Sequence, residues 1–557
     1  MALKLILPIN EGFIIQSDFL ERRLVDCEHV VKAVGFVTVG QHISRHSDFD
    51  SSTINLFTIL NSAVGGIVIK DVARSFIDRR LDFVESQLVN RISFKWLAPH
   101  FPSERRIALV GGLRNIWRIE CFFRAGKSLG IKLVVLDFAD HWVEDQNKSD
   151  CWKDFLPCDI SPTETLSDRI VHTLQSYSKH VDGLVTYHDE LLVPVAKAAV
   201  AMGLSTEPPP AFELATNKYK TREANMKHSQ LFHITGVSDL EGLLRSREDL
   251  AFPLIVKPRL GFSSRGVYKA HNEEELREAV IRNSSVAITS TSGPDQVIET
   301  YMDGPEVDAN MILLDAEILL FEVNDDIPSD ADNDSAPAFS SFHDTGNLIP
   351  SKLPQDELLR LRKTLHQSLL HAGFRSGIFH MEARIIHSKF EFSSVDGLVD
   401  LGPKSLPPEE DADVFLLEIN ARPPGMQETN AICRTYGIDY NAILLLNAVK
   451  DTERISALSR PFCQGAQYHC EMVMLCAQRG GLFDSDDVCA ELKQRCPDLV
   501  PSIADCCCFL RRGQKVEDPQ TGVYTHVAYF LVYSRISREE ARRLEQRIRT
   551  EVKYTIL

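Results

Sequence analysis

The sequence predicts a large multidomain protein of mixed α/β and α+β class, and three observations indicate this. The chain has 557 residues, 44% hydrophobic and 25% charged, which is typical of globular proteins and, at about 100–200 residues per domain, suggests three or four cores. A strand–helix–strand passage at 106–136 is typical of a doubly wound parallel sheet. Polar and apolar residues alternate over 380–384 and 415–422, as they do on strands with one buried face.

The first hundred residues contain predicted secondary structure but no motif that carries chemistry. An apolar run at 65–69 predicts a strand, and apolar residues at helical spacing over 76–89 predict a helix. The role of this N-terminal extension, residues 1–104, is left open.

The next segment has the pattern of an α/β domain. A strand at 106–110, a helix and a second strand at 131–136 form a β-α-β unit, and a further strand and helix follow over 181–202. No G-x-G-x-x-G follows these strands, which excludes a dinucleotide-binding fingerprint. Three prolines at 208–210 form a stiff break, where we expect the domain to end.

Charge and hydropathy narrow the range of partners. Lys and Arg total 61 and Asp and Glu total 78, so the formal net charge is −17. A field of that sign repels nucleic acid and anionic membranes, so we expect neither as a partner. No apolar run of about 18 residues is present, and the apolar start of the chain ends at Pro8, too early for a secretory core. We therefore expect a cytoplasmic protein.

The 13 cysteines indicate reduced, mostly buried thiols rather than a metal cluster. They are scattered along the chain without a C-x-x-C pair. Cys506, Cys507 and Cys508 are consecutive, and because neighbours on a strand point to opposite faces, the three cannot bind one zinc ion tetrahedrally.

Two later segments are expected to be loops. The Asp-x-Asp-x-Asp spacing at 330–334 is that of a calcium loop, but Ser335 stands where such a loop needs glycine. We therefore interpret 324–338 as a solvated acidic loop. The Pro-rich and acidic segment 393–413 is expected to be an insertion between two strands.

A lysine at a strand end is the first candidate site residue. The strand at 252–258 delivers Lys257, and a Gly/Ser-rich turn with Ser263 and Ser264 follows at 259–267. An ammonium group and small residues that expose backbone N–H groups suit a polyphosphate. An ordinary hairpin turn with an exposed lysine is the alternative. The P-loop pattern is absent.

Two carboxylates flank the next turn. An apolar strand at 297–302 carries Glu299, and Glu306 follows the Gly304-Pro305 turn. Carboxylates so placed can accept hydrogen bonds from an exocyclic amine and from ribose hydroxyls. Alternatively, they are surface acids beside a turn.

Two strands carry further acids on one face. The polar residues that share a face are His380, Glu382 and Arg384 on the first strand, and Glu418, Asn420 and Arg422 on the second. Glu382, Glu418 and Asn420 offer hard oxygen ligands, which select Mg²⁺ or Mn²⁺. Arg422 lies one step further along, where a transferring phosphoryl group needs positive charge. The alternative is a polar sheet face with paired charges.

In order and spacing, these segments resemble the ATP-grasp superfamily of carboxylate–amine ligases, and within it the L-amino-acid ligases and carnosine-synthase-like enzymes. The resemblance covers roughly residues 105–449. It implies a Rossmann-like pre-domain, a two-lobed ATP-grasp fold and a C-terminal α+β piece. The domains expected are the N-terminal extension (1–104), the α/β pre-ATP-grasp domain (105–210), the ATP-grasp domain (211–449) and the C-terminal α+β domain (450–557), the last with strands at 462–477 and 524–533 and a helix at 537–553.

The resemblance also implies a role for each site residue. Lys218 and Lys257 would contact ATP phosphates; Ser263 and Ser264 would lie in the phosphate loop; Glu299, Thr300, Tyr301 and Met302 would form the adenine-binding hinge; Glu306 would bind ribose; Glu382, Glu418 and Asn420 would bind Mg²⁺ or Mn²⁺, as two ions; and Arg422, with Lys257, would be catalytic and stabilise the acyl-phosphate and tetrahedral states.

The activity implied is ATP-dependent formation of an amide bond between a carboxylic acid, most simply an amino acid, and an amine. It would proceed through an acyl phosphate and release ADP and phosphate, and it would serve small-metabolite biosynthesis. The expected partners are small-molecule substrates, and a homodimer is compatible with this class. Two alternatives stay open: a non-catalytic ATP-binding regulator, and a related ligase or carboxylase with a substrate that is not an amino acid.

Two departures from the family prevent transfer of a substrate from any relative. Gly425 is followed by Met426 where relatives often carry a second glycine, and His343 stands where they often carry an acid.

Overall fold

The structure is a computed structural model. It describes residues 2–44, 56–70, 77–112, 116–145, 152–225, 230–247, 249–261, 264–287, 293–333, 339–343, 345–519 and 524–557.

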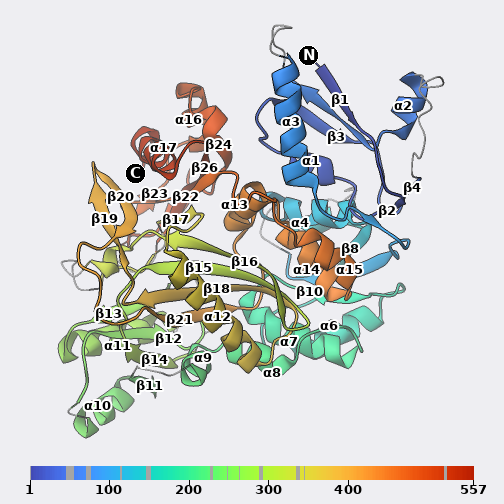
Figure 1. Cartoon of the computed structure of the whole chain (residues 1–557). Coiled ribbons are helices and arrows are strands. Elements are labelled where there is room, and N and C mark those ends of the chain that lie inside the picture. The colour runs from blue at the N-terminus through green and yellow to red at the C-terminus, as the bar shows by residue number, and fades with distance from the viewer. Residues whose placement is uncertain are drawn as a thin grey trace.

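The N-terminal region forms a small α+β unit at the upper right of Figure 1. Its antiparallel sheet contains β1 (Ala2–Ile6), β5 (Gly65–Ile69) and β3 (Val30–Gly35), and a second small sheet contains β4 (His42–Ile43), β2 (Gly12–Ile14) and β6 (Leu97–Ala98). The helices are α1 (Phe19–Arg23), α2 (Leu56–Ser62) and α3 (Ile77–Ile92). The strand predicted at 65–69 is confirmed. The helix predicted at 76–89 is confirmed over the described residues, and it continues three residues further, to Ile92.

The predicted parallel sheet follows. Its order is β10 (Gly183–Val185), β7 (Arg105–Val110), β8 (Ile131–Asp137) and β9 (Asp154–Pro157), with every pair parallel. The helices here are α4 (Ile116–Ser128), α5 (Trp142–Asp145), α6 (Leu166–Gln175), α7 (Asp189–Ala201) and α8 (Pro209–Ala215). Residues at the carboxyl end of a parallel strand gather at one edge of the sheet, so the turn between β10 and α7 is a place where functional residues are expected.

A separate antiparallel lobe carries the predicted phosphate strand, at the lower left of Figure 1. Its order is β11 (Leu231–Ile234), β14 (Gln296–Thr300), β12 (Leu254–Pro258) and β13 (Tyr268–Ala270), accompanied by α9 (Lys218–Ala224), α10 (Val237–Ser246) and α11 (Glu273–Ala287). Ile255 on β12 lies opposite Glu299 on β14. Because alternate residues share a face, Lys257 and Glu299 lie on the same side of this sheet.

A long antiparallel sheet forms the centre of the molecule. Among the described residues its order is β21 (Asp413–Asn420), β18 (Gly377–Ile386), β15 (Glu306–Leu314), β16 (Glu317–Asp326), β17 (Gly346–Ile349), β22 (His469–Cys476), β26 (His526–Ser534) and β24 (Ile503–Cys508). The helices that follow β17 in the chain are α12 (Gln355–Ala372), α13 (Met426–Tyr436), α14 (Tyr440–Ala448), α15 (Thr452–Leu458), α16 (Val488–Arg495) and α17 (Arg538–Glu551). The sheet therefore continues past residue 450, and β17 joins its two halves.

The remaining elements are short. They are the hairpin of β19 (Phe390–Val395) and β20 (Leu398–Pro403), the pair of β23 (Gly481–Leu482) and β25 (Lys515–Val516), and the 3₁₀ turns η2 (Asp330–Asp332) and η3 (Val500–Ser502). The hairpin occupies the start of the segment 393–413 that was expected to be an insertion, so part of this insertion is regular strand.

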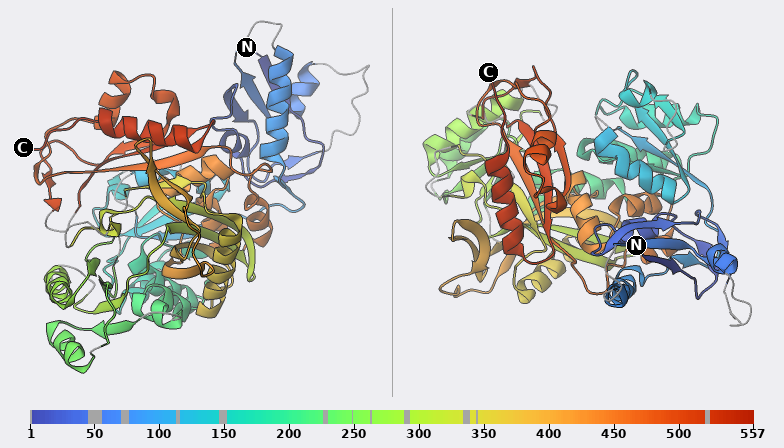
Figure 2. Two further views of the ribbon diagram at one scale, coloured as in Figure 1. Left: turned by 60° about the vertical axis from the view of Figure 1, so that its left-hand side comes forward. Right: turned by 90° about the horizontal axis from the view of Figure 1, so that it is seen from above.

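The C-terminal elements agree with the sequence. β22 lies within the predicted strand segment 462–477, whereas β26 ends one residue beyond the predicted segment 524–533. The helix predicted at 537–553 is confirmed as α17, which begins one residue later and ends two residues earlier. Helix α17 lies along β22 and β26, as Figure 2 shows. Its Ile548 is buried in the same apolar cluster as Val473 of β22 and Phe530 of β26.

The consecutive cysteines occupy β24 as predicted. Cys506 and Cys508 pack against one core and Cys507 against another, so the three thiols point to opposite faces. The twelve cysteines among the described residues are not in disulfide bonds. Within the same residues, no helix is long and apolar enough to cross a membrane.

Candidate active site

A buried group of charges lies on the inner face of the β11–β14 lobe. Lys257 Nζ is 2.6 Å from Glu299 Oε1, and Arg222 Nε is 2.7 Å from Glu299 Oε2. Arg222 also stacks over the ring of Phe415, at 3.6 Å from its centroid. Lys257 is 7% exposed and Glu299 2%, so the alternatives of an exposed lysine and a surface acid are wrong.

The charges of this group leave one cation in excess. Burial alone would raise the pKa of Glu299, but Lys257 and Arg222 lower it to about 2. Burial lowers the pKa of Lys257, and the nearby cations Arg222 and Lys218 lower it further. Two cations share one carboxylate, so an additional anion would stabilise the group.

The hinge residues follow Glu299 directly. Thr300 Oγ1 accepts a hydrogen bond from the backbone of Gln230 at 2.9 Å. Arg384 donates to the Tyr301 hydroxyl at 2.9 Å and to the Met302 carbonyl at 3.2 Å. The backbone that leads from the small lobe to the central sheet is therefore held from both sides.

Arg384 also fixes the carboxylate predicted to bind ribose. Its guanidinium lies 2.6 Å from Glu306 and 2.5 Å from Asp332. Burial would lower the pKa of Arg384, but these two carboxylates raise it. The interpretation of 324–338 as a solvated loop is wrong in part, because β16 extends to Asp326 and Asp332 is largely buried in this contact.

The predicted metal ligands meet on neighbouring strands. Glu382 on β18 lies directly opposite Glu418 on β21, and His380 lies opposite Asn420. Residues directly opposite each other have Cβ atoms about 4.5–5.5 Å apart, so both carboxylates can reach one position. The pairing shifts register between Glu382 and Ala383, and such bulges commonly aim side chains at a site. A set of carboxylate and amide oxygens fits Mg²⁺ or Mn²⁺.

Lys218 connects the two halves of the candidate site. Its ammonium forms an ion pair with Glu418, while its backbone N–H donates to the carbonyl of Arg259, just after Lys257, at 3.2 Å. Burial would lower the pKa of Lys218, but Glu418 and Glu382 raise it. The acid-bearing strands therefore lie beside the loop that follows the phosphate strand.

Arg422 is held by a residue that the sequence analysis missed. Arg422 Nε and Nη2 donate to the two carboxylate oxygens of Asp189 at 2.8 and 2.7 Å, and Nη2 is 3.4 Å from Asn420 Oδ1. Asp189 is the first residue of α7, in the turn that follows β10. Its position at the carboxyl end of a parallel strand was the one available signal.

A buried polar layer lies behind these strands. His380 Nδ1 is 3.0 Å from Asn310 Oδ1, and Asn310 Nδ2 donates to Glu322 at 2.6 Å. Burial, together with the charge of Arg422, lowers the pKa of His380 to about 3, so its imidazole is neutral near pH 7. Burial and the neighbouring Glu428 raise the pKa of Glu322 well above its usual range.

The serines of the predicted phosphate loop are only partly described. Ser263 lies outside the described residues. Ser264 has a φ of 50°, a left-handed backbone conformation that is uncommon outside glycine. Their role stays a prediction.

Two lobes that meet at Lys218, with the buried Lys257 on one and paired acids on the other, are the arrangement expected of an ATP-grasp ligase. The sequence profile of the ATP-grasp N-terminal domain matches residues 123–206, and that of the ATP-grasp domain matches residues 250–394.

Curated and solved relatives agree with this class. The chain is 38% identical to "ATP-grasp enzyme fsqD" of Aspergillus fumigatus over 574 aligned positions, which cover 100% of this chain and 98% of that protein. It is 22% identical to human "Carnosine synthase 1" over 286 positions, 48% of this chain and 30% of that protein. The crystal structure of an L-amino acid ligase from Bacillus licheniformis matches 81% of this chain and 99% of its own, with a TM-score of 0.61 and 20% identity.

The chain belongs to the ATP-grasp family of ATP-dependent ligases. The fold class and the enzyme class predicted from the sequence are thereby confirmed. The roles of individual site residues stay predictions, and their geometry is the basis of the proposal that follows.

Proposed function

We propose that this enzyme joins a carboxylic acid, most simply an amino acid, to an amine in an ATP-dependent reaction that releases ADP and phosphate. One observation carries the proposal. Lys218 touches Glu418 with its side chain and the end of the Lys257 strand with its backbone, so cations for a polyphosphate and oxygen ligands for a metal border one space.

The donor set fits the nucleotide and metal that this class implies. When bound, ATP supplies the phosphoryl group that activates the carboxylate, and Mg²⁺ or Mn²⁺, as two ions, neutralises phosphate charge. Glu382, Glu418 and Asn420 would hold the metal. Lys257, which shares the carboxylate of Glu299 with Arg222 and is therefore only partly neutralised, would contact phosphate.

The hinge and its flanks would hold the nucleoside. Glu299, Thr300, Tyr301 and Met302 lie where the small lobe meets the central sheet, and the backbone groups of that stretch would face adenine. Glu306, oriented by its ion pair with Arg384, would accept hydrogen bonds from ribose hydroxyls.

Arg422 would act at the reacting carboxyl group. The carboxylate oxygen attacks the γ-phosphorus as ADP leaves; the amine nitrogen then attacks the acyl carbon, phosphate leaves and the amine loses a proton. Negative charge develops on the acyl oxygen in the second step, and a guanidinium held rigidly by Asp189 stabilises such charge without reorganising.

The names of the relatives support the substrate class. One of these relatives is named an L-amino acid ligase, and another is named a carnosine synthase. These matches are at or below 22% identity, so they support the reaction type and leave both substrates to experiment.

The test is a search for substrate-dependent ATP hydrolysis. Purified enzyme and Mg-ATP are incubated with amino acids singly and in pairs, phosphate and ADP are measured, and products are weighed by mass spectrometry. Phosphate release that requires one pair, with a product mass equal to their sum minus water, is the expected result. AMP and pyrophosphate instead of ADP would refute the acyl-phosphate route, and phosphate release that needs bicarbonate would identify a carboxylase.

Glu418→Gln tests the metal assignment once a substrate pair is found. The amide is nearly isosteric with the carboxylate, so the fold should be kept, while the loss of a charged ligand should lower kcat about 100-fold or more, because metal charge stabilisation amounts to several kcal/mol. Glu391→Gln on the exposed face of β19 is the matched control and should leave kcat unchanged. Near-normal turnover of Glu418→Gln would remove this residue from the metal site.

A further inference from the structure

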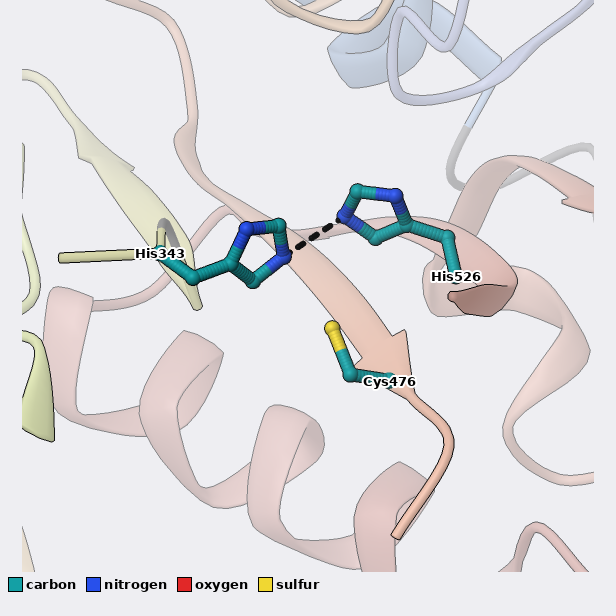
Figure 3. Close-up of side chains that lie close together, drawn as sticks. All are labelled: His343, Cys476 and His526. Carbon is teal, nitrogen blue, oxygen red and sulfur yellow. Dashed lines mark hydrogen bonds between the residues drawn. The ribbon is translucent and has the colours of Figure 1, made fainter. Parts of the chain in front are cut away.

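A second cluster of metal-ligating side chains lies away from the acids described above. It consists of His343, in the segment that precedes β17, Cys476 at the end of β22 and His526 at the start of β26 (Figure 3). The ligand atoms of the three residues all lie within 4.8 Å of one another. The two imidazoles face each other, with 2.8 Å between their Nε2 atoms.

The central sheet brings these residues together. Cys476 and His526 are partners in the register of β22 and β26, so the backbone ladder fixes their separation. Met474 of β22 donates a backbone hydrogen bond to Thr345 at 3.3 Å, which holds the segment of His343 beside the same strand end. The ring of Tyr524 stacks on His343, with centroids 5.0 Å apart and planes 7° apart, and so restricts the orientation of that imidazole.

We propose that His343, Cys476 and His526 bind one divalent transition-metal ion of the Zn²⁺ class. Two imidazole nitrogens and one thiolate are the donors that such an ion prefers, whereas Mg²⁺ prefers oxygen. Three protein ligands leave a fourth position for water or for a substrate group, as in catalytic zinc sites. All three residues are half-buried, which gives that position a path to solvent.

The two imidazole nitrogens require only a small adjustment to bind one ion. With Zn–N distances of about 2.0–2.1 Å and tetrahedral angles, the two ligand nitrogens lie about 3.3 Å apart. The imidazoles therefore need to separate by roughly 0.5 Å from the 2.8 Å of their present contact. The register of β22 and β26 fixes the backbone positions of Cys476 and His526, so this separation is a matter of small side-chain shifts.

The site also touches the candidate active site through one neighbouring residue. The ring of Phe342, next to His343, lies 6.4 Å from the ring of Tyr301 in the hinge. Its centroid is 5.9 Å from the guanidinium of Arg384. An ion at His343 would thus tie the segment that lines the hinge to the C-terminal strands. Metal binding itself does not depend on the proposed ligase activity.

Cobalt is the probe for this proposal. Full-length protein is stripped of metal with a chelator and titrated with Co²⁺, and absorption is followed. One Co²⁺ per chain with a thiolate-to-cobalt charge-transfer band, displaced by one equivalent of Zn²⁺, is expected. Cobalt bound by the carboxylates of Glu382 and Glu418 has no thiolate ligand and lacks the charge-transfer band. The Glu418→Gln variant should therefore show the same band as the wild type.

Matched variants test the assignment of the ligands. Cys476→Ser should abolish the charge-transfer band, and His343→Gln or His526→Gln should weaken Co²⁺ binding at least about tenfold, since even indirect changes near a metal cost that much. Cys507→Ser on the adjacent β24 and His469→Gln at the far end of β22 serve as controls and should change neither.

Three results would overturn the proposal. They are the absence of the band at stoichiometric Co²⁺, a band unaffected by Cys476→Ser, and a band lost equally in Cys507→Ser. Thermal melting of each variant separates loss of a ligand from loss of the fold. If Cys476→Ser does not fold, the test uses His526→Gln instead, which changes a ligand on the neighbouring strand.

Discussion

Glu299 is the carboxylate that pairs with two buried cations, Lys257 and Arg222, and replacing it should weaken the small lobe. In Glu299→Gln, Lys257 and Arg222 keep their positions but lose the charge that neutralises them. Removal of one partner from a buried ion pair leaves uncompensated charge and is strongly destabilising.

The size of the effect follows from the pKa of Glu299, which falls from 4.5 to about 2 in the folded protein. At 1.36 kcal/mol per unit, this difference corresponds to about 3 kcal/mol of stability near neutral pH. Because the folded pKa is depressed, this stability is fully present above pH 4.5 and is lost as the pH falls towards 2.

Hydrogen–deuterium exchange read by mass spectrometry measures this locally, which suits a protein of several domains. Peptides that cover β12 and β14 should exchange on the order of 100 times faster in Glu299→Gln than in the wild type at pH 7, since 3 kcal/mol is about two factors of ten. The difference between the two proteins should shrink between pH 4.5 and 2.

The control is Glu241→Gln, which removes an exposed ion pair to Arg277 in the same lobe. Exposed pairs contribute little, so its exchange should match that of the wild type. Equal exchange of Glu299→Gln and wild type at pH 7, or a difference that grows on acidification, would refute the reasoning.

Two further changes address the active-site arginines. Asp189→Asn keeps one neutral acceptor but loses the charge-assisted contact with Arg422, a loss of about 1–2 kcal/mol, so kcat should fall roughly tenfold with little change in KM for ATP; an unchanged kcat would show that Arg422 does not act in the reaction. Arg384→Gln leaves Glu306 and Asp332 without their buried cation, so KM for ATP should rise by about tenfold or more and the melting temperature should fall; a variant with normal nucleotide affinity would exclude Glu306 from ribose binding.

Local periodicity predicted the elements that carry the site. The strands that contain Lys257 and Glu418 were recognisable because apolar runs, and the alternation of polar and apolar residues, are visible within a few consecutive residues. The prediction that Glu382 and Glu418 bind the same metal rested on the alternation of polar residues together with the family resemblance. The register of β18 and β21, which places the two residues opposite each other, agrees with it.

Contacts between distant segments were beyond that reasoning. Asp189 and Arg422 are 233 positions apart, and no pattern near either residue specifies the other. Asp332 looked like part of a solvated acidic loop because its partner, Arg384, comes from another strand of the sheet. Tertiary pairing decides burial at such positions, and composition alone does not reveal it.

The four-residue strand β17 limits how enzymes of this architecture can be recombined. It pairs with β16 on one side and with β22 on the other, where Asn347 lies opposite Met472 and Leu348 opposite Glu471. A chimera that takes its C-terminal half from a relative must reproduce this register, because a slip of one residue would turn every side chain of β22 to the other face. Glu471, now buried against Arg542, would then lose its counter-ion. Crossover points for exchanging substrate specificity therefore belong before β17, so that β17 and β22 travel together from one parent.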